Sequence, residues 1–412
     1  MTTDRTTLIT FLGRVPRDDH GYRKTRYDFG DGQSADEFAF FGWALQRQIK
    51  PQNIVILGTI GSMWDHLFEG DFNLGAAAEH QREALMGAVD AQRVTQHQLD
   101  ELAPALAAHL NCRVRLGIVP YAYDGVAADL LVQMAADVFE TDIVHLDVTH
   151  GLRHLPMLAL LSALYIRITK RATIAGIWYG AYDCDTGRGQ AHNLAGIMRI
   201  ADSLQALSSF DKDGDYGVFM PLLEQSGASP QVVEALKKAS YYENLLNVGQ
   251  ATGQLRQALR ALETEAPGLA PDVAPLLPTI QRRLQWVDED RQFEKQLALA
   301  THALERRDYL RATLYAYEAV ITRVCQIQSA KIESFEEREG ARKVYEKQSE
   351  GLPEYQDYKL LKHLRNEVAH GTRGSTAEVQ RALLNELVMY ELLKRLLDAI
   401  RQGRLPSHED GV

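Results

Sequence analysis

The segment IVHLDVTHGLRHLP, residues 143–156, leads from a β-rich run into a helical pattern through a junction of polar residues and a glycine. Residues 143–148 are rich in apolar and β-branched side chains, which favours a buried strand. Residues 152–169 repeat apolar side chains at helical spacing. A strand that runs directly into a helix is the repeating unit of an α/β fold, so this segment predicts that fold class.

The same unit recurs on both sides of this segment. Four further β-rich runs are expected to form strands, at 7–12, 53–57, 113–119 and 173–179. Further helical patterns are expected at 36–50, 76–109 and 124–140. This alternation predicts parallel pairing in a doubly wound, Rossmann-like sheet, which binds ligands at the carboxyl ends of its strands.

The strand signals stop near residue 190, and the rest of the chain has the apolar spacing of helices. A chain of 412 residues is also too long for one ordinary core. We therefore predict an α/β domain at 1–185, a helical connector at 186–290 and an all-α terminal domain at 291–412.

Composition narrows the function classes. The apolar fraction of 45% and the charged fraction of 24% match an ordinary globular protein, which excludes extensive disorder. The net charge of −10 excludes a large basic face for nucleic acid, so any RNA contact should be local. Three cysteines lie far apart in the sequence, at Cys112, Cys184 and Cys325, so neither disulfides nor a thiolate zinc site is expected. This use of cysteine predicts a cytoplasmic location. The longest apolar run, 155–168, is shorter than the roughly 20 residues of a membrane span, so no membrane segment is expected.

The loop after the first strand, residues 13–27, reads GRVPRDDHGYRKTRY. It carries five cations, at Arg14, Arg17, Arg23, Lys24 and Arg26. Such a loop can clamp a polyanion while a tyrosine stacks on a base. A solvated surface loop is the alternative.

The second strand leads into LGTIGSMWD, residues 57–65, whose glycines permit a tight turn. Ser62 and Asp65 resemble a capping box, which predicts a helix start there. A helix start offers backbone N–H groups to a phosphate, although plain turn chemistry explains the same residues.

The junction at 147–156 places polar side chains where a central strand ends. Thr149 and His150 can bond a phosphate or a ribose, and Arg153 can add positive charge. A satisfied structural turn remains an alternative. A metal site made by His145, His150 and His154 is not favoured, because His145 would lie on a different element and no carboxylate or thiolate lies at ligand spacing beside it. A catalytic triad is not favoured either, because no Ser or Cys lies nearby.

Taken together, DVTHGLRHLP at 147–156, ITFLGR at 9–14 and LGTIGSMWD at 57–65 resemble the DxTHG class of CRISPR-associated Rossmann-fold (CARF) domains. The resemblance covers nearly all of residues 7–182. It implies a dimeric sensor of cyclic oligoadenylate, the ring-shaped messenger of type III CRISPR complexes, with the tetra-adenylate ring favoured over the hexa-adenylate ring. The residues implied to line the ring pocket are Gly13, Arg14, Thr59, Ser62, Thr149, His150, Gly151 and Arg153, and Tyr179, Gly180 and Ala181 are implied to contribute.

Near the chain end, RNEVAHG at 365–371 lies in a helical pattern that Gly371 is expected to stop. This run resembles the R-x4-H motif of HEPN ribonucleases, which implies that Arg365, Asn366 and His370 are catalytic. The alternative is that Arg365 pairs with Glu367 or Asp357 and His370 is only a charge at a helix C-terminus.

The chemistry needs no metal and no cofactor. A histidine can act as general base on a ribose 2′-hydroxyl or as general acid to the leaving 5′-oxygen, and an arginine can stabilise the phosphate transition state. Asn366 would orient a partner or the RNA. The expected substrate is single-stranded RNA and the expected product a 2′,3′-cyclic phosphate.

Residues five apart on a helix are turned by about 140° and displaced by about 7.5 Å, so Arg365 and His370 of one chain do not easily converge. Two chains related by a two-fold axis can bring both pairs into one cleft. We therefore expect a homodimer, with higher oligomers left open.

The sequence thus predicts a metal-independent endoribonuclease that cyclic oligoadenylate activates in type III CRISPR antiviral defence. Whether the sensor domain also cleaves its own ring is left open. The alternative is a non-catalytic, ligand-responsive regulator whose helical domain binds a partner.

Overall fold

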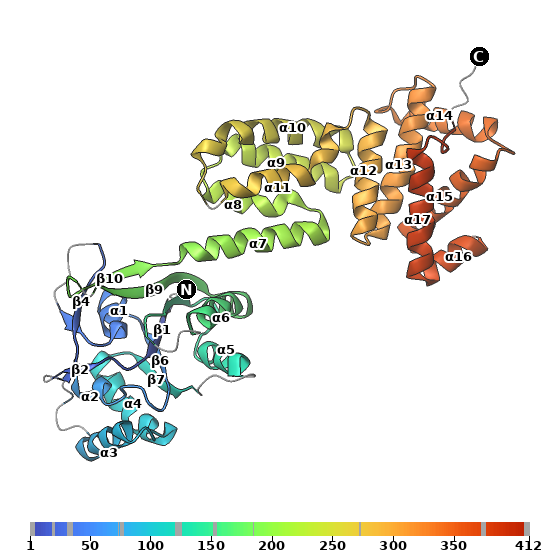
Figure 1. Ribbon diagram of the computed structural model, residues 1–412. Helices are drawn as coiled ribbons and strands as arrows, with labels where there is room; N and C mark the ends of the chain where they lie inside the picture. Colours follow the sequence, from blue (N-terminus) through green and yellow to red (C-terminus); the bar gives the residue numbers. More distant parts are fainter. Residues whose placement is uncertain are drawn as a thin grey trace. The chain divides into compact units, whose positions relative to one another are not determined.

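The computed structural model divides the chain into two compact units, Met1–Met198 and Arg199–Val412, which are described separately (Figure 1). The residues that it describes are 5–18, 21–30, 36–72, 74, 78–119, 126–150, 155–183, 185–271, 273–371 and 376–407, without the side chains of 18, 126–129 and 155–157.

The N-terminal unit is built on a mixed, mainly parallel sheet. Within the described residues it has eight strands in the order β5-β4-β10-β9-β8-β1-β6-β7. Their bounds are β1 Thr6–Leu12, β4 Thr25–Asp28, β5 Glu37–Phe38, β6 Asn53–Gly58, β7 Arg113–Ile118, β8 Ile143–Asp147, β9 Thr173–Asp183 and β10 Arg188–Asn193. The strands from β9 to β7 are parallel, which confirms the predicted fold class.

The register brings three strand ends together. Leu12 at the end of β1 pairs with Gly58 at the end of β6, and Thr10 of β1 pairs with Asp147 at the end of β8. The loops that follow β1, β6 and β8 therefore leave the sheet at one edge.

Side chains on the central strands alternate between two apolar cores. Leu8 and Leu12 of β1 belong to one core, and Ile9 and Phe11 belong to the other. The first core is covered by α1 Phe41–Ile49, α2 His66–Glu69, α3 Glu79–Asp90 and α4 Gln96–Leu110. The second is covered by α5 Val126–Ala136 and α6 Leu155–Lys170. The sheet is thus buried on both faces, as a doubly wound fold requires.

Three details differ from the sequence prediction. The expected helix at 76–109 is two helices, because the chain leaves the helical conformation after α3 and restarts at the capping box of Thr95 and Gln98. The expected helix at 36–50 begins only at Phe41, after β5. The short strands β4, β5 and β10 were not predicted.

The N-terminal unit continues beyond residue 185. Strand β10 pairs antiparallel with β9, from Arg188 opposite Asp183 to Asn193 opposite Trp178. Met198, near the start of α7 Gly196–Asp213, still packs in the second core of the sheet. The same helix carries Ala206 and Phe210, which belong to the core of the helical unit.

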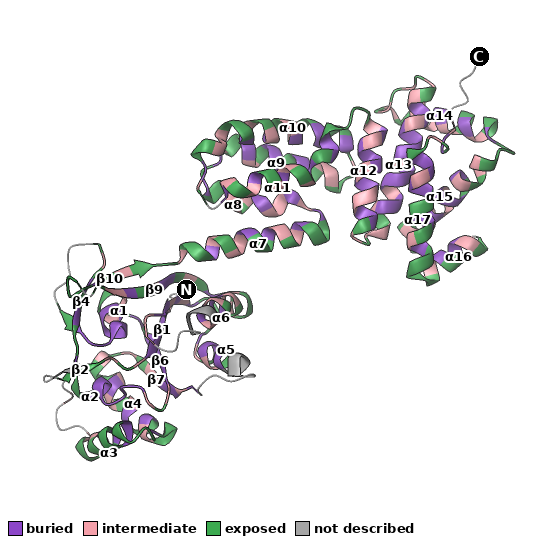
Figure 2. Cartoon of the chain, viewed as in Figure 1, coloured by how far each residue is buried: buried purple, intermediate pink, exposed green. Residues whose placement is uncertain are grey.

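The second unit is all helical in the part that the structure describes. Its further α-helices are α8 Met220–Gln225, α9 Pro230–Asn244, α10 Val248–Glu265, α11 Leu277–Arg283, α12 Gln292–Glu305, α13 Tyr309–Ile327, α14 Phe335–Gln348, α15 Pro353–His370, α16 Ala377–Leu384 and α17 Glu386–Arg401. One apolar core runs through both predicted parts of this region, and Figure 2 shows buried faces on α12, α13 and α17 turned inward. The division into a connector and a terminal domain stays a prediction. None of the described helices is both long and apolar enough to cross a membrane.

Candidate functional site

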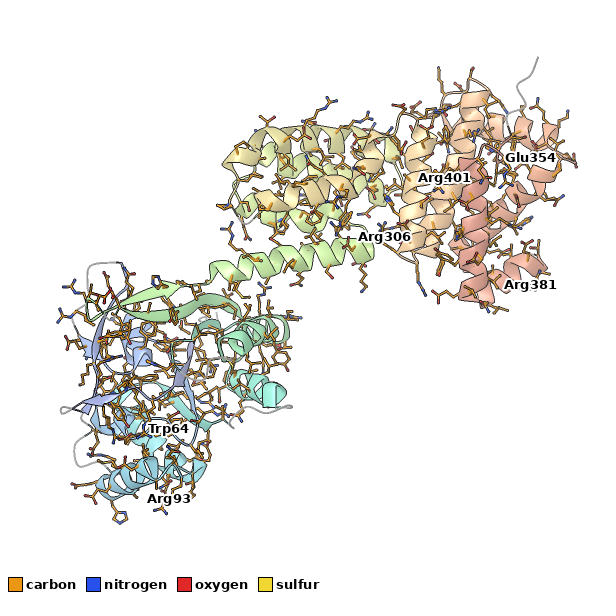
Figure 3. All side chains as sticks on the ribbon, in the orientation of Figure 1. Trp64, Arg93, Arg306, Glu354, Arg381 and Arg401 are labelled. Carbon is orange, nitrogen blue, oxygen red and sulfur yellow. The ribbon has the colours of Figure 1, made fainter. Side chains whose placement is uncertain are left out.

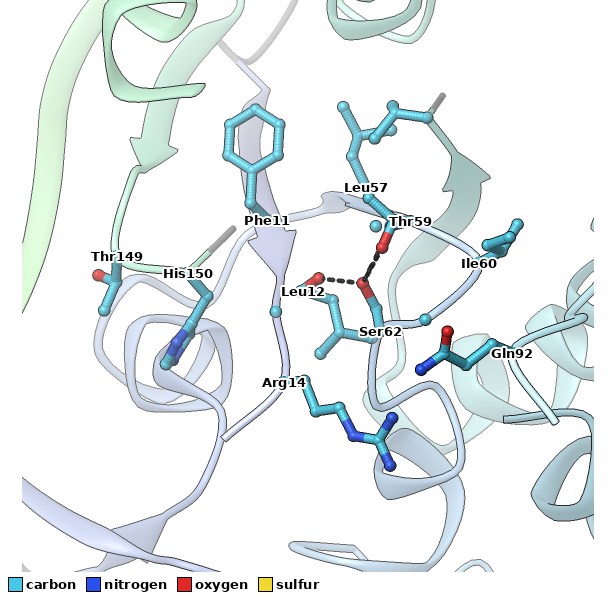
Figure 4. A pocket seen from close by; sticks show the side chains of 14 residues that line it. Phe11, Leu12, Arg14, Leu57, Thr59, Ile60, Ser62, Gln92, Thr149 and His150 are labelled. Atoms are coloured by element: carbon cyan, nitrogen blue, oxygen red, sulfur yellow. Dashed lines mark hydrogen bonds between the residues drawn. The ribbon is translucent and has the colours of Figure 1, made fainter. Parts of the chain in front are cut away.

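A hollow of about 540 Å³ lies at the sheet edge where β1, β6 and β8 end (Figure 4). Six of the eight residues predicted to line a ligand pocket lie in its wall, namely Gly13, Arg14, Thr59, Ser62, Thr149 and His150. Gly151 and Arg153 lie outside the described residues. The prediction that separate loops meet at the carboxyl ends of the strands is therefore met by this geometry.

Ser62 braces the turn after β6. Its Oγ donates to the carbonyl oxygen of Leu12 at 2.6 Å and accepts from the backbone N–H of Thr59 at 2.9 Å. Gly58 makes this packing possible, because a Cβ there would lie 2.9 Å from the Ser62 Oγ. Trp64, labelled in Figure 3, is fully buried and donates from Nε1 to the Thr59 carbonyl at 2.8 Å. Ser62 thus shapes the wall of the hollow.

The capping box expected of Ser62 and Asp65 does not form. Helix α2 begins at His66, and Asp65 makes no side-chain cap to it. The Asp65 carboxylate instead accepts from Arg17 at 2.8 Å and from the Tyr22 hydroxyl at 3.1 Å. The charged Arg17 of the first loop takes the place of the local cap, because a charge-assisted hydrogen bond stabilises the buried carboxylate more than a bond from one backbone N–H does.

Asp147 holds the junction that follows β8. It is fully buried and accepts from the Thr10 hydroxyl at 2.6 Å and from the Thr149 N–H at 2.8 Å. Burial raises the pKa of Asp147 to about 6, and these two hydrogen bonds oppose that rise. The Thr149 hydroxyl oxygen accepts from the Gly180 N–H at 2.7 Å, and the hydroxyl also stabilises the ionised Asp147 carboxyl.

His150 enters the hollow as a neutral group. Burial lowers the pKa of His150 to about 4, so the ring is uncharged at pH 7. Its Nε2 accepts from the Phe41 N–H at 3.3 Å, which assigns the remaining proton to Nδ1. His150 can therefore offer one N–H donor to a ligand.

The first loop presents one of its five cations to the hollow. Three of the others pair with carboxylates, Arg17 with Asp65, Lys24 with Asp71 and Arg26 with Glu37. The guanidinium of Arg23 lies 4.1 Å from the centre of the Tyr182 ring. Arg14 alone among these five lines the hollow, so the loop is largely neutralised by internal contacts.

The charge of the hollow suits an anion. Its described lining residues include Arg14 as the one formal cation and no carboxylate. The chain as a whole carries a net charge of −10. A wall free of carboxylates is therefore a local property of this site. Metal binding has no comparable support, since no group of three His, Cys, Asp or Glu side chains gathers within the described residues.

The sequence did not identify Gln92, which lines the hollow from the turn between α3 and α4. The prediction placed this position inside one long helix, so its side chain had no reason to face a strand end. The signal available was the pattern Thr95-x-x-Gln98, which is typical of a capping box and marks a new helix start.

The second predicted site lies on α15. Arg365 and Asn366 are half-buried, and the Arg365 guanidinium donates from Nη1 to the Asn366 Oδ1 at 3.0 Å. It also lies 5.5 Å from the centre of the Tyr317 ring on α13. His370 is exposed on the last helical turn, and Gly371 ends the helix with a left-handed φ of 64°. The structure thus brings Arg365 and Asn366 together and leaves His370 on a different side of the helix.

The contacts around Arg365 bear on the alternative interpretation. Asp357, one proposed partner, pairs with Arg395 at 3.5 Å. The Arg365 Nε is buried without a hydrogen-bond partner in the described part of the chain. A buried donor of this kind costs free energy unless a ligand satisfies it.

Comparison with known proteins addresses the N-terminal unit. Residues 7–182 match the family described as CRISPR system endoribonuclease Csx1, CARF domain. This unit contains a CARF domain. The matched range includes every residue that lines the hollow, and it ends just before β10.

A curated relative extends the likeness beyond the CARF domain. It is the CRISPR-associated protein MJ1674 of Methanocaldococcus jannaschii, which is 21% identical over 382 residues. The alignment covers 85% of this chain and 59% of the relative, so the chain spans less than two thirds of the length of that protein. The likeness to a CRISPR-associated protein thus extends beyond the CARF domain into the helical unit.

Proposed function

We propose that this protein is a metal-independent endoribonuclease that cyclic oligoadenylate activates in type III CRISPR antiviral defence. The observation that carries the proposal is the hollow of the CARF domain, whose described wall holds an arginine and no carboxylate in a chain of net charge −10. A phosphate-bearing ligand is the chemical class that such a wall fits.

Each polar residue has a role toward a cyclic oligonucleotide. Arg14 would bind a phosphate through its guanidinium. Thr149 would hold the junction after β8 in place beside the ligand, because its hydroxyl links the Gly180 N–H to the Asp147 carboxyl. His150 would donate from Nδ1 to a phosphate or ribose oxygen, because its Nε2 is occupied by Phe41. All three act without changing their charge.

Cleavage would take place on the helical unit. His370 would act as general base or acid on the RNA, and Arg365 would stabilise the phosphate transition state. Asn366 already bonds the Arg365 guanidinium and would orient it. Because Arg365 packs toward Tyr317 whereas His370 is exposed, a complete site is best formed from two chains about a two-fold axis.

Activation couples two separate sites. The ring would bind the CARF domain, whereas the RNA would bind the helical unit. A ring can switch on cleavage only if it binds the cutting state of the dimer more tightly than the idle state. The coupling therefore has to appear as a change in ring affinity as well as a change in rate.

The test is cleavage of a fluorescent single-stranded RNA by the full chain in EDTA. Cyclic tri-, tetra- and hexa-adenylate are each compared with no ligand. We expect cleavage with the tetra-adenylate ring, and products that end in a 2′,3′-cyclic phosphate. Cleavage that requires a divalent metal ion would overturn the proposed mechanism.

The same experiment separates the other assignments. If no ring induces RNA cleavage and a partner is captured only when a ring is present, the chain is a non-catalytic regulator. Chromatography of the ring after long incubation with excess protein tests cleavage of the messenger itself, and an intact ring would exclude that activity.

A further inference from the structure

The hollow of the CARF domain has two chemically different sides. Thr149 and His150 lie on one side of Arg14, and Ile60 and Gln92 lie on the other (Figure 4). The first side offers the imidazole donor of His150, as a sugar-phosphate backbone needs. The second side has no charged group among its described residues.

The second side has the composition of a binding surface for a nucleobase. Ile60 supplies apolar surface and exposes 46% of its area, and it lies beside the buried Leu57 and Val119. Gln92 is the polar side chain at this end, and its carboxamide carries a donor and an acceptor side by side. A nucleobase likewise has apolar faces and a polar edge.

Gln92 is held at this place by its backbone. It follows α3 with a left-handed φ of 51°, and its N–H donates to Val89 at 3.1 Å. The next N–H, that of Arg93, donates to Ala88 at 2.9 Å, which completes a C-terminal helix cap. A Cβ built on Gly61 would lie 3.9 Å from the Gln92 Cδ, so the carboxamide lies next to the turn after β6.

The Gln92 carboxamide is available to a ligand. Within the described part of the chain, neither its oxygen nor its nitrogen takes part in a hydrogen bond. The side chain is exposed, whereas the helix end that carries it is anchored by the buried Val89. The Gln92 backbone is therefore held in place, while the oxygen and nitrogen of its carboxamide can bind a ligand.

We propose that Gln92 recognises the adenine base of the bound nucleotide, a function that rests on ring binding by the CARF domain. Adenine places the donor N6 beside the acceptor N7, and a glutamine carboxamide pairs with both atoms at once. Its oxygen accepts from the N6 amino group while its nitrogen donates to the ring nitrogen. The exposed side chain of Ile60 contacts the face of the base.

The experiment measures ring affinity of the full chain by isothermal titration calorimetry. Two ligands are compared, cyclic tetra-adenylate and cyclic tetra-inosinate, because inosine replaces the N6 donor with an oxygen acceptor. The variant is Gln92→Gly, which removes the carboxamide and suits the left-handed backbone, so the turn stays folded. The control is Gln81→Ala on α3, which removes an exposed glutamine that does not line the hollow.

We expect the wild-type chain and Gln81→Ala to bind the adenylate ring at least about tenfold more tightly than the inosinate ring. Gln92→Gly should lose about tenfold in affinity for the adenylate ring and should no longer distinguish the two rings. Equal adenylate affinity in Gln92→Gly and wild type overturns the assignment of Gln92 alone. Failure of the wild-type chain to bind the tri-, tetra- or hexa-adenylate ring overturns the proposed function, and the base recognition with it.

Discussion

Asp147 is buried and His150, three residues further on, is half-buried, and desolvation shifts their pKa values in opposite directions. Desolvation disfavours the charged form of each, so the carboxyl tends to keep its proton and the imidazole tends to lose one. At pH 7 the Asp147 carboxyl, with a pKa of about 6, is largely ionised, whereas His150 is neutral. Arg14 is the one formal cation among the described residues that line the hollow.

The Thr10 hydroxyl lowers the free energy of the ionised Asp147. The folded pKa of Asp147 is raised to about 6, so stability falls as pH rises toward that value and the carboxylate forms. Thr10→Val removes the hydrogen bond of 2.6 Å. We expect the variant to lose about 1 kcal/mol of unfolding free energy at pH 5 and about 2 kcal/mol at pH 8, because bonds to charged groups are stronger.

Calorimetric unfolding of the full chain at the two pH values provides the measurement. Thr313→Val is the matched control, because its hydroxyl is also buried but donates to the Tyr309 carbonyl at 2.7 Å. The unfolding free energy lost in Thr313→Val should not change with pH. A cost of Thr10→Val that is the same at pH 5 and pH 8 would show that Asp147 does not ionise in this window.

His150 should contribute to ring binding without a positive charge. Because burial lowers the pKa of His150 to about 4, its imidazole is a neutral donor throughout the range from about pH 5.5 to pH 8. We expect His150→Gln to weaken ring binding by a constant factor over about that range, since glutamine also offers a neutral donor and acceptor. A difference in affinity that widens below about pH 6.5 would instead show that the imidazolium binds the phosphate.

Helices and strands differ in how far the sequence could predict them. The long central strands were found because residues such as Ile54, Ile56 and Leu146 are buried among apolar neighbours, and that leaves a continuous pattern. Strand β10 was missed because its sequence, RGQAHN, has no apolar period. It forms because β9 offers a partner along its whole length, which is information that a local pattern does not contain.

The same distinction applies to the candidate site. Thr59, Thr149 and His150 were predictable because they follow strands that end at one sheet edge. Gln92 was not, because it follows a helix, and its contact with Gly61 arises only when α3 packs on the sheet. Asp65 was misinterpreted because its partner, Arg17, lies 48 residues away in the sequence.

Helix α15 ends at His370, so its last turn decides where the proposed general base lies. Gly371 has a φ of 64°, and a Cβ there would meet no atom within 4 Å. Gly371→Ala should therefore lower the unfolding free energy by about 1 kcal/mol through backbone strain alone. We also expect slower RNA cleavage, because the last turn would fray.

The same substitution inside a helix should have the opposite sign. Gly340 is exposed in the middle of α14, and a Cβ there also meets nothing within 4 Å. Gly340→Ala should raise the unfolding free energy by about 0.5–1 kcal/mol. Denaturant unfolding of both variants measures this contrast, and a stabilising Gly371→Ala would contradict the left-handed cap.

The two units place different chemistry on one chain. The CARF domain contributes the hollow lined by Arg14, and the helical unit contributes Arg365, Asn366 and His370 on a single helix. Neither part accounts for an activated ribonuclease alone. The first lacks an assigned RNA-cleaving group, and the second holds its arginine and histidine about 140° apart around the helix axis.

A composite site makes a prediction that only paired chains can test. Arg365→Ala and His370→Ala should each abolish ring-dependent RNA cleavage and leave ring affinity unchanged, because both residues lie outside the CARF domain. Co-expression of the two variants in equal amounts should restore about a quarter of the wild-type rate. Random pairing makes about half of the dimers mixed, and each mixed dimer keeps one of its two pairs, with Arg365 from one chain and His370 from the other.

The restored rate discriminates between the two possible arrangements. If each chain used its own Arg365 and His370, no chain in the mixture would have both residues, and cleavage would remain absent. Mixed dimers must therefore be isolated by tagging the two variants differently, so that a failure to form mixed dimers is not mistaken for inactive mixed dimers. Cleavage by the purified mixed dimer places the arginine and the histidine of one site on different chains, which makes dimerisation a chemical requirement of the reaction.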